Sequence, residues 1–393
     1  MKQMVQTRTR IGSIDLLRGV VMVIMALDHV RDFFHNDADL HVPTDPHTTT
    51  PILFFTRFIT HFCAPTFILL AGISAFLYGT KRTKKELSLF LIKRGIWLII
   101  VEFVLVTFAI RFDPMYHLLI LQVIWTIGIC MIILGVVIWL PMPVIFVVGL
   151  CIVAGHNLFD AGEMGMPRRM TFWRDLLHHG FFVRYPNNGR IQLLIVYPFA
   201  AWAGVMMLGY CLGTLYKSSV EALRRKKTLV FLGLGMIVAF VVLRLLNGYG
   251  DPVPWSQQQN SVATFLSFMN VNKYPPSLMY ICITIGPALI FLALTEKVNN
   301  KVSDFFKIYG NVPLFYYVVH FFVIHILSVG LFYLQGFGSK DIVNNLFFRP
   351  KTLGVDLWGV YIVWVVVVAI MYPLCKSFGR FKHQHDKWWT SYV

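Results

Sequence analysis

The sequence predicts an all-α polytopic membrane protein with about ten transmembrane helices, folded as a single domain over residues 1–393. Hydrophobic residues make up 57% of the chain and charged residues 14%, whereas roughly a quarter of the residues in soluble domains are charged. Mean hydropathy is +0.65, and apolar runs of about 20 residues, the length that crosses a bilayer, recur along the chain. The first run is full length, carries charges and lacks a small-residue cleavage site, so it predicts a retained span rather than a signal peptide.

Basic segments orient the expected spans. Clusters of Lys and Arg precede the first span and follow the second, sixth, eighth and tenth, and all of them fall on one side when the number of spans is even. Because cytoplasmic loops carry the excess of Lys and Arg, both termini are expected in the cytoplasm. The expected spans are 13–34, 52–79, 88–110, 117–140, 143–159, 191–215, 228–246, 276–296, 308–334 and 355–377.

Charge and cysteine usage argue against several other classes of protein. The formal charge is +16, but the basic clusters lie between spans on one side, which indicates membrane topology and no nucleic-acid partner. The six cysteines lie in apolar stretches without CxxC or Cys/His spacing, so we interpret them as small hydrophobic residues rather than a disulfide or zinc framework. Walker, GxSxG and HExxH patterns do not occur, which disfavours ATPases, serine hydrolases and zincins.

The first span carries ionisable residues that a lipid-facing helix would exclude. His29 lies eleven positions after Arg18, and at 100° per residue eleven steps return to within about 20° of the same helix face. Ionisable groups inside a span nearly always face a protein interior or a wet cavity, so this helix is expected to line one. The stripe on this face comprises Asp15, Arg18, Met22, Met25, His29 and Asp32.

Two residues of this stripe suggest chemistry. His29, in the outer third of the span, could take a proton from an acceptor hydroxyl or amine, with Asp28 or Asp32 tuning and orienting its ring. Arg18, near the inner end, could hold an anionic group such as a cofactor phosphate. His29 is therefore the candidate general base and Arg18 the candidate cofactor ligand.

The same helix also allows a purely structural interpretation. Asp15 and Arg18, and likewise Asp28 and Arg31, are three residues apart, which is the spacing of ion pairs on one helix face. Such pairs would cap the helix ends without contributing to chemistry. In the functional interpretation, Asp15 lies beside the cofactor and Arg31 lies at the acceptor site.

Other spans place polar residues at the same depth. Arg57 and His61 lie one turn apart in the outer part of the second span, and Lys273 and Tyr274 precede the eighth span at its outer mouth. These side chains predict a wet pocket that is open to the outside. For His61, a hydrogen bond to a carbonyl of a neighbouring helix is the structural alternative.

The ninth span and the first outer loop supply further histidines. Tyr316 and His320 share one face of the ninth span, so His320 is a candidate pocket residue, whereas His325 is turned away by about 140° and is interpreted as structural. In the first outer loop the spacing fits no recognised zinc pattern, so no metal site is expected there. The potential ligands in that loop are His35, Asp37, Asp39, His41 and Asp45.

Five segments together resemble bacterial members of the heparan-α-glucosaminide N-acetyltransferase catalytic-domain family, and the resemblance spans most of the chain. These segments are Ser13–Gly19, Leu27–Phe34, His61–Pro65, Lys273–Leu278 and Val312–His320. The spacing from Arg18 to His29 also resembles the first-helix motif of the acyltransferase-3 family, which belongs to the same broad group of transmembrane acyltransferases.

The resemblance implies a multi-helix acyltransferase in which acetyl-CoA enters from the cytoplasm and the acetyl group reaches a sugar acceptor at the outer face. The acyltransferase-3 match makes His29 the catalytic histidine and Arg18 a helper near the CoA. In the lysosomal enzyme, however, the active histidine lies in the loop after the first span, and Asn stands in the place of His29. His35 and His41 therefore remain alternatives for the catalytic histidine.

We thus expect an acetyl-CoA (acyl-CoA)-dependent O- or N-acyltransferase whose partners are acyl-CoA, a glycan or small-molecule acceptor and membrane lipid, without a metal. The sequence also allows a homo-oligomer. The competing interpretation is a proton-coupled secondary transporter of a small polar or anionic substrate, in which the same buried charges relay protons. A non-catalytic scaffold is a third alternative. The expected acceptor-site residues are Arg31, Arg57, His61, Lys273, Tyr274 and His320.

Overall fold

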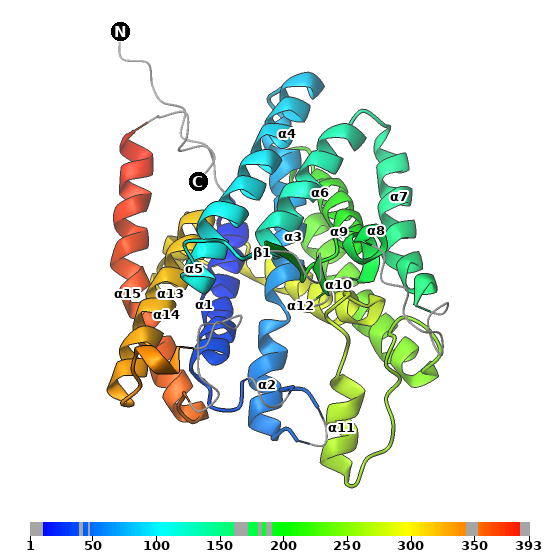
Figure 1. The fold of residues 1–393 in the computed structure, drawn as a ribbon. Helices are drawn as coiled ribbons and strands as arrows, with labels where there is room; N and C mark the ends of the chain where they lie inside the picture. Colours follow the sequence, from blue (N-terminus) through cyan, green and yellow to red (C-terminus); the bar gives the residue numbers. More distant parts are fainter. Residues whose placement is uncertain are drawn as a thin grey trace.

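The computed structural model is mostly helical, as expected (Figure 1). It describes residues 11–38, 42–45, 48–160, 172–179, 183–185, 191–342 and 353–385. The α-helices are α1 (Gly12–Phe34), α2 (Pro51–Thr60), α3 (Cys63–Gly79), α4 (Lys84–Val101), α5 (Thr107–Arg111), α6 (Val123–Val137), α7 (Met142–Gly155), α8 (Phe172–Arg174), α9 (Ala200–Leu212), α10 (Ala222–Leu246), α11 (Ser261–Met269), α12 (Leu278–Thr295), α13 (Lys301–Gly310), α14 (Pro313–Leu334) and α15 (Leu357–Gln384). Short π- and 3-10 segments are η1 (Glu102–Val106), η2 (His156–Phe159), η3 (Asp175–His179), η4 (Gly213–Tyr216) and η5 (Ser339–Asp341).

Six helical segments within the described residues are long and apolar enough to cross a membrane, which supports a membrane protein. The helix α1 has 23 residues but carries ionisable groups along its length, and α6 and α9 are shorter apolar helices. The expected ten spans and the cytoplasmic position of both termini therefore remain predictions. The six segments are Pro51–Gly79, Met142–Phe159, Ala222–Leu246, Leu278–Thr295, Pro313–Leu334 and Leu357–Lys382.

Two of the expected all-helical spans begin as β-strands. The strand β1 (Leu118–Leu121) pairs in parallel with β3 (Gln192–Ile195), and β2 (Val183–Tyr185) pairs antiparallel with β3. The expectation of helix at the start of 117–140 and 191–215 was therefore wrong. A short apolar run fits a buried strand as well as a helix, and only the pairing of two distant segments decides between them.

The second expected span is broken in the middle rather than continuous. Helix α2 ends at Thr60 and α3 begins at Cys63, with a turn at His61 and Phe62. Pro65 lacks the N–H that would bond the carbonyl of His61 in a continuous helix. That carbonyl instead accepts a hydrogen bond of 2.8 Å from the hydroxyl of Tyr280 in α12. The break thus ties α3 to α12 and turns His61 toward the interior.

The helix α1 is the centre of the bundle, because it packs against α2, α3, α12, α13, α14 and α15 (Figure 1). Its contact with α13 is a direct approach of two backbones. A Cβ atom added to Gly19 would lie 1.9 Å from the carbonyl oxygen of Phe306, and one added to Gly310 would lie 2.0 Å from that of Asp15. Small residues permit such close approach of helices in membranes.

We expect Gly19→Val to destabilise the protein by about 1–3 kcal/mol or more, because overpacking forces the two backbones apart. The measurement is the melting temperature of the purified protein in detergent. Gly235→Val is the matched control, since Gly235 also lies inside a membrane helix but has no atom within 4 Å of its added Cβ. Equal melting temperatures for the two variants would contradict the close contact of α1 with α13.

Candidate active site

Two cavities flank the helix α1, one toward each of its ends. We call them the His29 cavity, of about 450 Å³, and the Arg18 cavity, of about 320 Å³. The two residues that name them lie eleven positions apart, or about 16 Å along the helix. All six residues of the predicted stripe line one of these cavities: Met25, His29 and Asp32 line the first, and Asp15, Arg18 and Met22 line the second.

A buried carboxylate organises the charge in the His29 cavity. Nη1 of Arg57 lies 2.5 Å from both carboxylate oxygens of Asp28. Nη2 of Arg31 lies 3.0 Å and Nζ of Lys273 3.6 Å from the same carboxylate. The side chain of Asp28 is only 10% exposed, so one buried carboxylate joins α1, α2 and the segment before α12. Charges removed from water in this way need such partners.

The guanidinium of Arg31 has donors to spare. It donates a hydrogen bond of 2.5 Å to Asp32 and pairs with Asp28, but its Nε and Nη1 atoms are buried and have no acceptor among the described residues. Arg31 also lines the His29 cavity. Unsatisfied buried donors are costly, so these two atoms mark a place where a ligand oxygen would be stabilised.

Two histidines from distant helices form a hydrogen-bonded chain. Nδ1 of His320 lies 2.6 Å from the carbonyl oxygen of Tyr317 and 3.0 Å from that of Tyr316. Its Nε2 lies 2.7 Å from Nδ1 of His29. A carbonyl only accepts hydrogen bonds, so Nδ1 of His320 carries a proton, and in a neutral ring its Nε2 is then an acceptor.

This chain fixes the tautomer of His29. Because Nε2 of His320 accepts, Nδ1 of His29 donates to it, and the lone pair of the neutral His29 ring is left on Nε2. That nitrogen has no hydrogen-bond partner among the described residues, and His29 lines the cavity. The ring stacks on Phe321 with centroids 4.2 Å apart. The His29 ring is thus held at the wall of the His29 cavity, with the lone pair of its neutral form on Nε2.

The partner that orients His29 differs from the one expected from the sequence. Asp28 is bound by Arg57, and Asp32 accepts a hydrogen bond from Arg31. The hydrogen bond to the His29 ring comes instead from His320. The structure thus gives His29 a histidine as its hydrogen-bond partner, whereas the sequence suggested Asp28 or Asp32. Sequence reasoning could place His320 only as a possible pocket residue, because the pairing joins residues that are 291 positions apart.

The remaining wall of the His29 cavity contains His61, Lys273 and Tyr274. Nζ of Lys273 lies 5.2 Å from the ring centroid of Tyr274, and the Tyr274 hydroxyl donates a hydrogen bond of 3.3 Å to that of Tyr197. The side chain of His61 is buried at the break between α2 and α3. All the expected acceptor-site residues except His320 line this cavity directly, and His320 lies behind His29.

A buried aspartate holds the segment that carries Lys273. Asp251 accepts hydrogen bonds of 2.9 Å from the backbone N–H of Asn272 and 2.7 Å from the hydroxyl of Ser277. Burial raises the pKa of Asp251 above the usual value for an aspartate, although these two hydrogen bonds oppose the shift. Asp251 thereby fixes both ends of the segment 272–277 and presents Lys273 to Asp28.

The Arg18 cavity combines cationic and apolar walls. Arg18 pairs with Asp15 at 2.9 Å and donates hydrogen bonds of 3.2 Å to the carbonyl of Gly310 and the hydroxyl of Ser74. Arg18 is thus anchored to α1, α13 and α3, as the structural interpretation of its pairing with Asp15 required, and it also lines the cavity. The cationic lining is completed by Arg94 and Lys382, and the apolar lining includes Phe90, Leu91, Leu98, Ile124, Ile127 and Met131.

Three side chains line both cavities and therefore separate them: Phe67, Val123 and Tyr317. The hydroxyl of Tyr317 donates a hydrogen bond of 3.2 Å to the side-chain carbonyl of Gln122. Sequence reasoning did not identify Tyr317, because it stood beside Tyr316 in an apolar run. It also noted Arg94 only as part of a basic cluster, since nothing in the sequence shows that α4 turns this residue inward.

The alternative catalytic histidines fall elsewhere. His35 is buried at the end of α1, where its backbone bridges to Val355, and it lines neither of the two cavities. His41 and Asp39 lie outside the described residues, and so does that part of the metal site considered for this loop. Nδ1 of His325 donates a hydrogen bond of 2.9 Å to the carbonyl oxygen of Ala109, since a carbonyl oxygen only accepts.

Comparison with known proteins gives one family. A family model described as heparan-alpha-glucosaminide N-acetyltransferase, catalytic, matches residues 10–244, which is 235 of the 393 residues. The matched range includes Arg18, His29, Arg57 and His61, whereas Lys273 and His320 lie beyond it. The comparison with curated proteins found no match.

Proposed function

The chain belongs to the heparan-α-glucosaminide N-acetyltransferase catalytic family, a family of membrane acetyltransferases. We propose that it transfers an acetyl group from acetyl-CoA on one side of the membrane to an acceptor on the other side. In this proposal the donor binds at the cytoplasmic face of a bacterial inner membrane. The acceptor is a hydroxyl or amine, such as that of a sugar, at the outer face. The observation that carries the proposal is the hydrogen-bonded chain that leaves Nε2 of His29 as a base in the His29 cavity.

The Arg18 cavity has the chemistry of a donor site. Arg18, Arg94 and Lys382 would face the phosphates of the CoA, and the apolar wall would accompany its pantetheine arm. Arginine suits phosphate because its planar guanidinium makes two parallel hydrogen bonds. Arg18 and Lys382 also lie toward the ends of α1 and α15 that the charge distribution assigns to the cytoplasm, and Arg94 lies in the middle of α4.

The His29 cavity has the chemistry of an acceptor site. Its three cations, Arg31, Arg57 and Lys273, exceed its two carboxylates, Asp28 and Asp32. The free donors of Arg31 would bind an acceptor oxygen. A polar, oxygen-rich molecule such as a sugar meets these requirements, whereas an alkyl chain leaves the donors unsatisfied.

The chemistry then requires one proton to move from the acceptor to the leaving sulfur, in two transfers through His29. Nε2 of His29 takes the proton from the acceptor hydroxyl or amine as its oxygen or nitrogen bonds to the acetyl carbon. His29 returns the proton to the sulfur as the bond between carbon and sulfur breaks, so the acceptor leaves acetylated and the CoA leaves as its thiol. His320 accepts from Nδ1 throughout and thereby stabilises the protonated ring. Phe67, Val123 and Tyr317 border the place where the two substrates meet.

The direct test is release of free thiol from acetyl-CoA by the purified protein in lipid nanodiscs, with amino sugars and glycan extracts as acceptors. Acceptor-dependent thiol release is expected. A secondary transporter, the rival class, would move substrate without consuming the thioester. Absence of thiol release with every acceptor, from protein that is folded by its melting curve, would contradict the acyltransferase proposal.

We expect Arg94→Gln to raise the KM for acetyl-CoA by about 10-fold or more, because a charge-assisted hydrogen bond contributes about 1.5–3 kcal/mol. The measurement is initial rate against acetyl-CoA concentration. Lys93→Gln is the matched control, because Lys93 is the adjacent residue on α4 but is exposed and does not line the cavity. Equal KM values for the two variants would show that Arg94 does not bind acetyl-CoA.

A further inference from the structure

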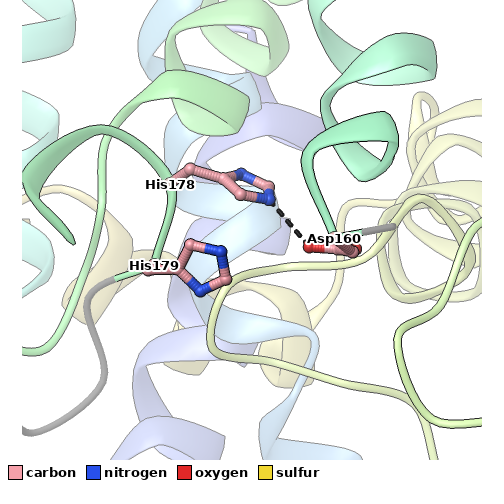
Figure 2. Close-up of side chains that lie close together, drawn as sticks. All are labelled: Asp160, His178 and His179. Carbon is pink, nitrogen blue, oxygen red and sulfur yellow. Dashed lines mark hydrogen bonds and ion pairs between the residues drawn. The ribbon is translucent and has the colours of Figure 1, made fainter. Parts of the chain in front are cut away.

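A second cluster of ionisable side chains lies away from both cavities. Asp160 follows η2, and His178 and His179 are the last two residues of η3. The ligand atoms of these three residues all lie within 4.8 Å of one another. Nε2 of His178 lies 2.8 Å from Oδ1 of Asp160, and Figure 2 shows the two imidazole rings and the carboxylate gathered around one space. Two imidazoles and one carboxylate are ligands that suit Zn²⁺.

An adjacent histidine gives an independent reason to expect a ligand there. His156 is 4% exposed, and both of its ring nitrogens are buried without a hydrogen-bond partner among the described residues. Its ring centroid lies 5.4 Å from that of His178. A buried imidazole that makes no hydrogen bond loses its interactions with water and gains nothing in return. A metal ion or its bound water would satisfy one of these nitrogens.

We propose that Asp160, His178 and His179 bind a divalent transition-metal ion, with Zn²⁺ the best match to the ligand set, and that His156 completes or supports its coordination. The carboxylate and the two neutral imidazoles give three ligands, and the fourth position of a tetrahedral ion falls to His156 or to water. The ion takes the place of the proton that His178 and Asp160 otherwise share.

The position of the cluster indicates a structural role for the ion. Asn157 donates a hydrogen bond of 2.6 Å to Oδ2 of Asp160, and its side-chain oxygen accepts one of 2.9 Å from the backbone N–H of Leu278. The ion would therefore fasten the segment 172–179 to the end of α7 and, through Asn157, to the first residue of α12. The segment that carries Lys273 directly precedes α12, so the ion would also steady one wall of the His29 cavity.

The test uses full-length protein purified through a tag without histidine, stripped with a chelator and dialysed against Zn²⁺. We expect one Zn²⁺ per chain by elemental analysis and a higher melting temperature than for the stripped protein, since an ion that binds only the folded state stabilises it. His178→Ala and His179→Ala should lose the ion. His156→Ala should lower the affinity for the ion by about 10–100-fold, as removal of a supporting residue does.

His117→Ala is the matched control, because His117 also pairs with an aspartate, Asp113, at 2.9 Å, yet that pair belongs to no group of three potential ligands among the described residues. It should retain the ion. Co²⁺ in place of Zn²⁺ gives a readout that needs no variant: an intense visible absorption band is expected for a four-coordinate site. Wild-type protein that retains no ion, a weak spectrum typical of hydrated Co²⁺, or equal retention by His178→Ala and wild type would overturn the proposal.

Discussion

His29→Ala is expected to lower the rate of acetyl transfer by about 10²–10⁴-fold, which is the usual contribution of a positioned general base. The loss should fall on kcat, because in the proposed mechanism Nε2 of His29 acts only on the proton, and the other cavity walls are unchanged. The rate is measured as thiol release from acetyl-CoA with and without acceptor. The melting temperature should change little, because His29 is only partly buried.

Two other histidines sharpen this prediction. His320→Gln should lower kcat less than His29→Ala and alter the pH profile of the rate, because His320 positions the His29 ring without touching the acceptor. His117→Ala should behave as wild type, since His117 lies in an exposed turn. If His35→Ala abolished transfer in folded protein while His29→Ala did not, the catalytic histidine would be His35 and our assignment would be wrong.

Asp28→Ala is expected to destabilise the protein by about 3–5 kcal/mol, which is the cost of removing one member of a buried ion pair. The substitution leaves Arg31, Arg57 and Lys273 without the carboxylate that holds them together. The segment before α12 and the helix α2 should then separate from α1. A large drop in melting temperature and increased proteolysis of the folded protein are the measurements.

Asp32→Ala is the control for Asp28→Ala. Its side chain also pairs with Arg31, at 2.5 Å, but it is 27% exposed, against 10% for Asp28. Water already screens the Asp32 carboxylate in part, and Arg31 keeps its ion pair with Asp28 in this variant, so a loss of at most about 1 kcal/mol is expected. The double variant Asp28→Ala with Arg57→Leu should recover part of the stability, because it removes a cation together with its anion. Equal effects of the two single variants would show that Asp28 does not hold a buried charge centre.

The stripe on α1 could be predicted because it depends on one helix alone. Helical periodicity places Arg18 and His29 on one face. Because charge in lipid is costly, this face is expected to lie against a cavity. Both cavities border the predicted residues. The family could likewise be inferred from the sequence, since short segments carry the resemblance and the family match covers residues 10–244.

The partners of these residues could not be predicted, because each pairing joins distant parts of the chain. Nothing near His29 in the sequence indicates that His320 would bind it, and an adjacent aspartate was the simpler candidate. In the same way, Asp28 could have paired with Arg31 alone, whereas the structure adds Arg57 and Lys273. The strand β1 was missed for a related reason. Four apolar residues fit a strand or a helix equally well, and only their pairing with a distant segment makes them a strand.

The thin wall of Phe67, Val123 and Tyr317 has a consequence for the cell as well as for the reaction. A continuous water-filled path through a membrane protein would let ions move down the membrane potential. Each elementary charge that crosses 100 mV releases about 2.3 kcal/mol. In the proposed function, the mostly hydrocarbon side chains of these three residues, which line both cavities, would keep water and ions on one side of the membrane apart from those on the other. An acetyl group would then cross without a leak of ions.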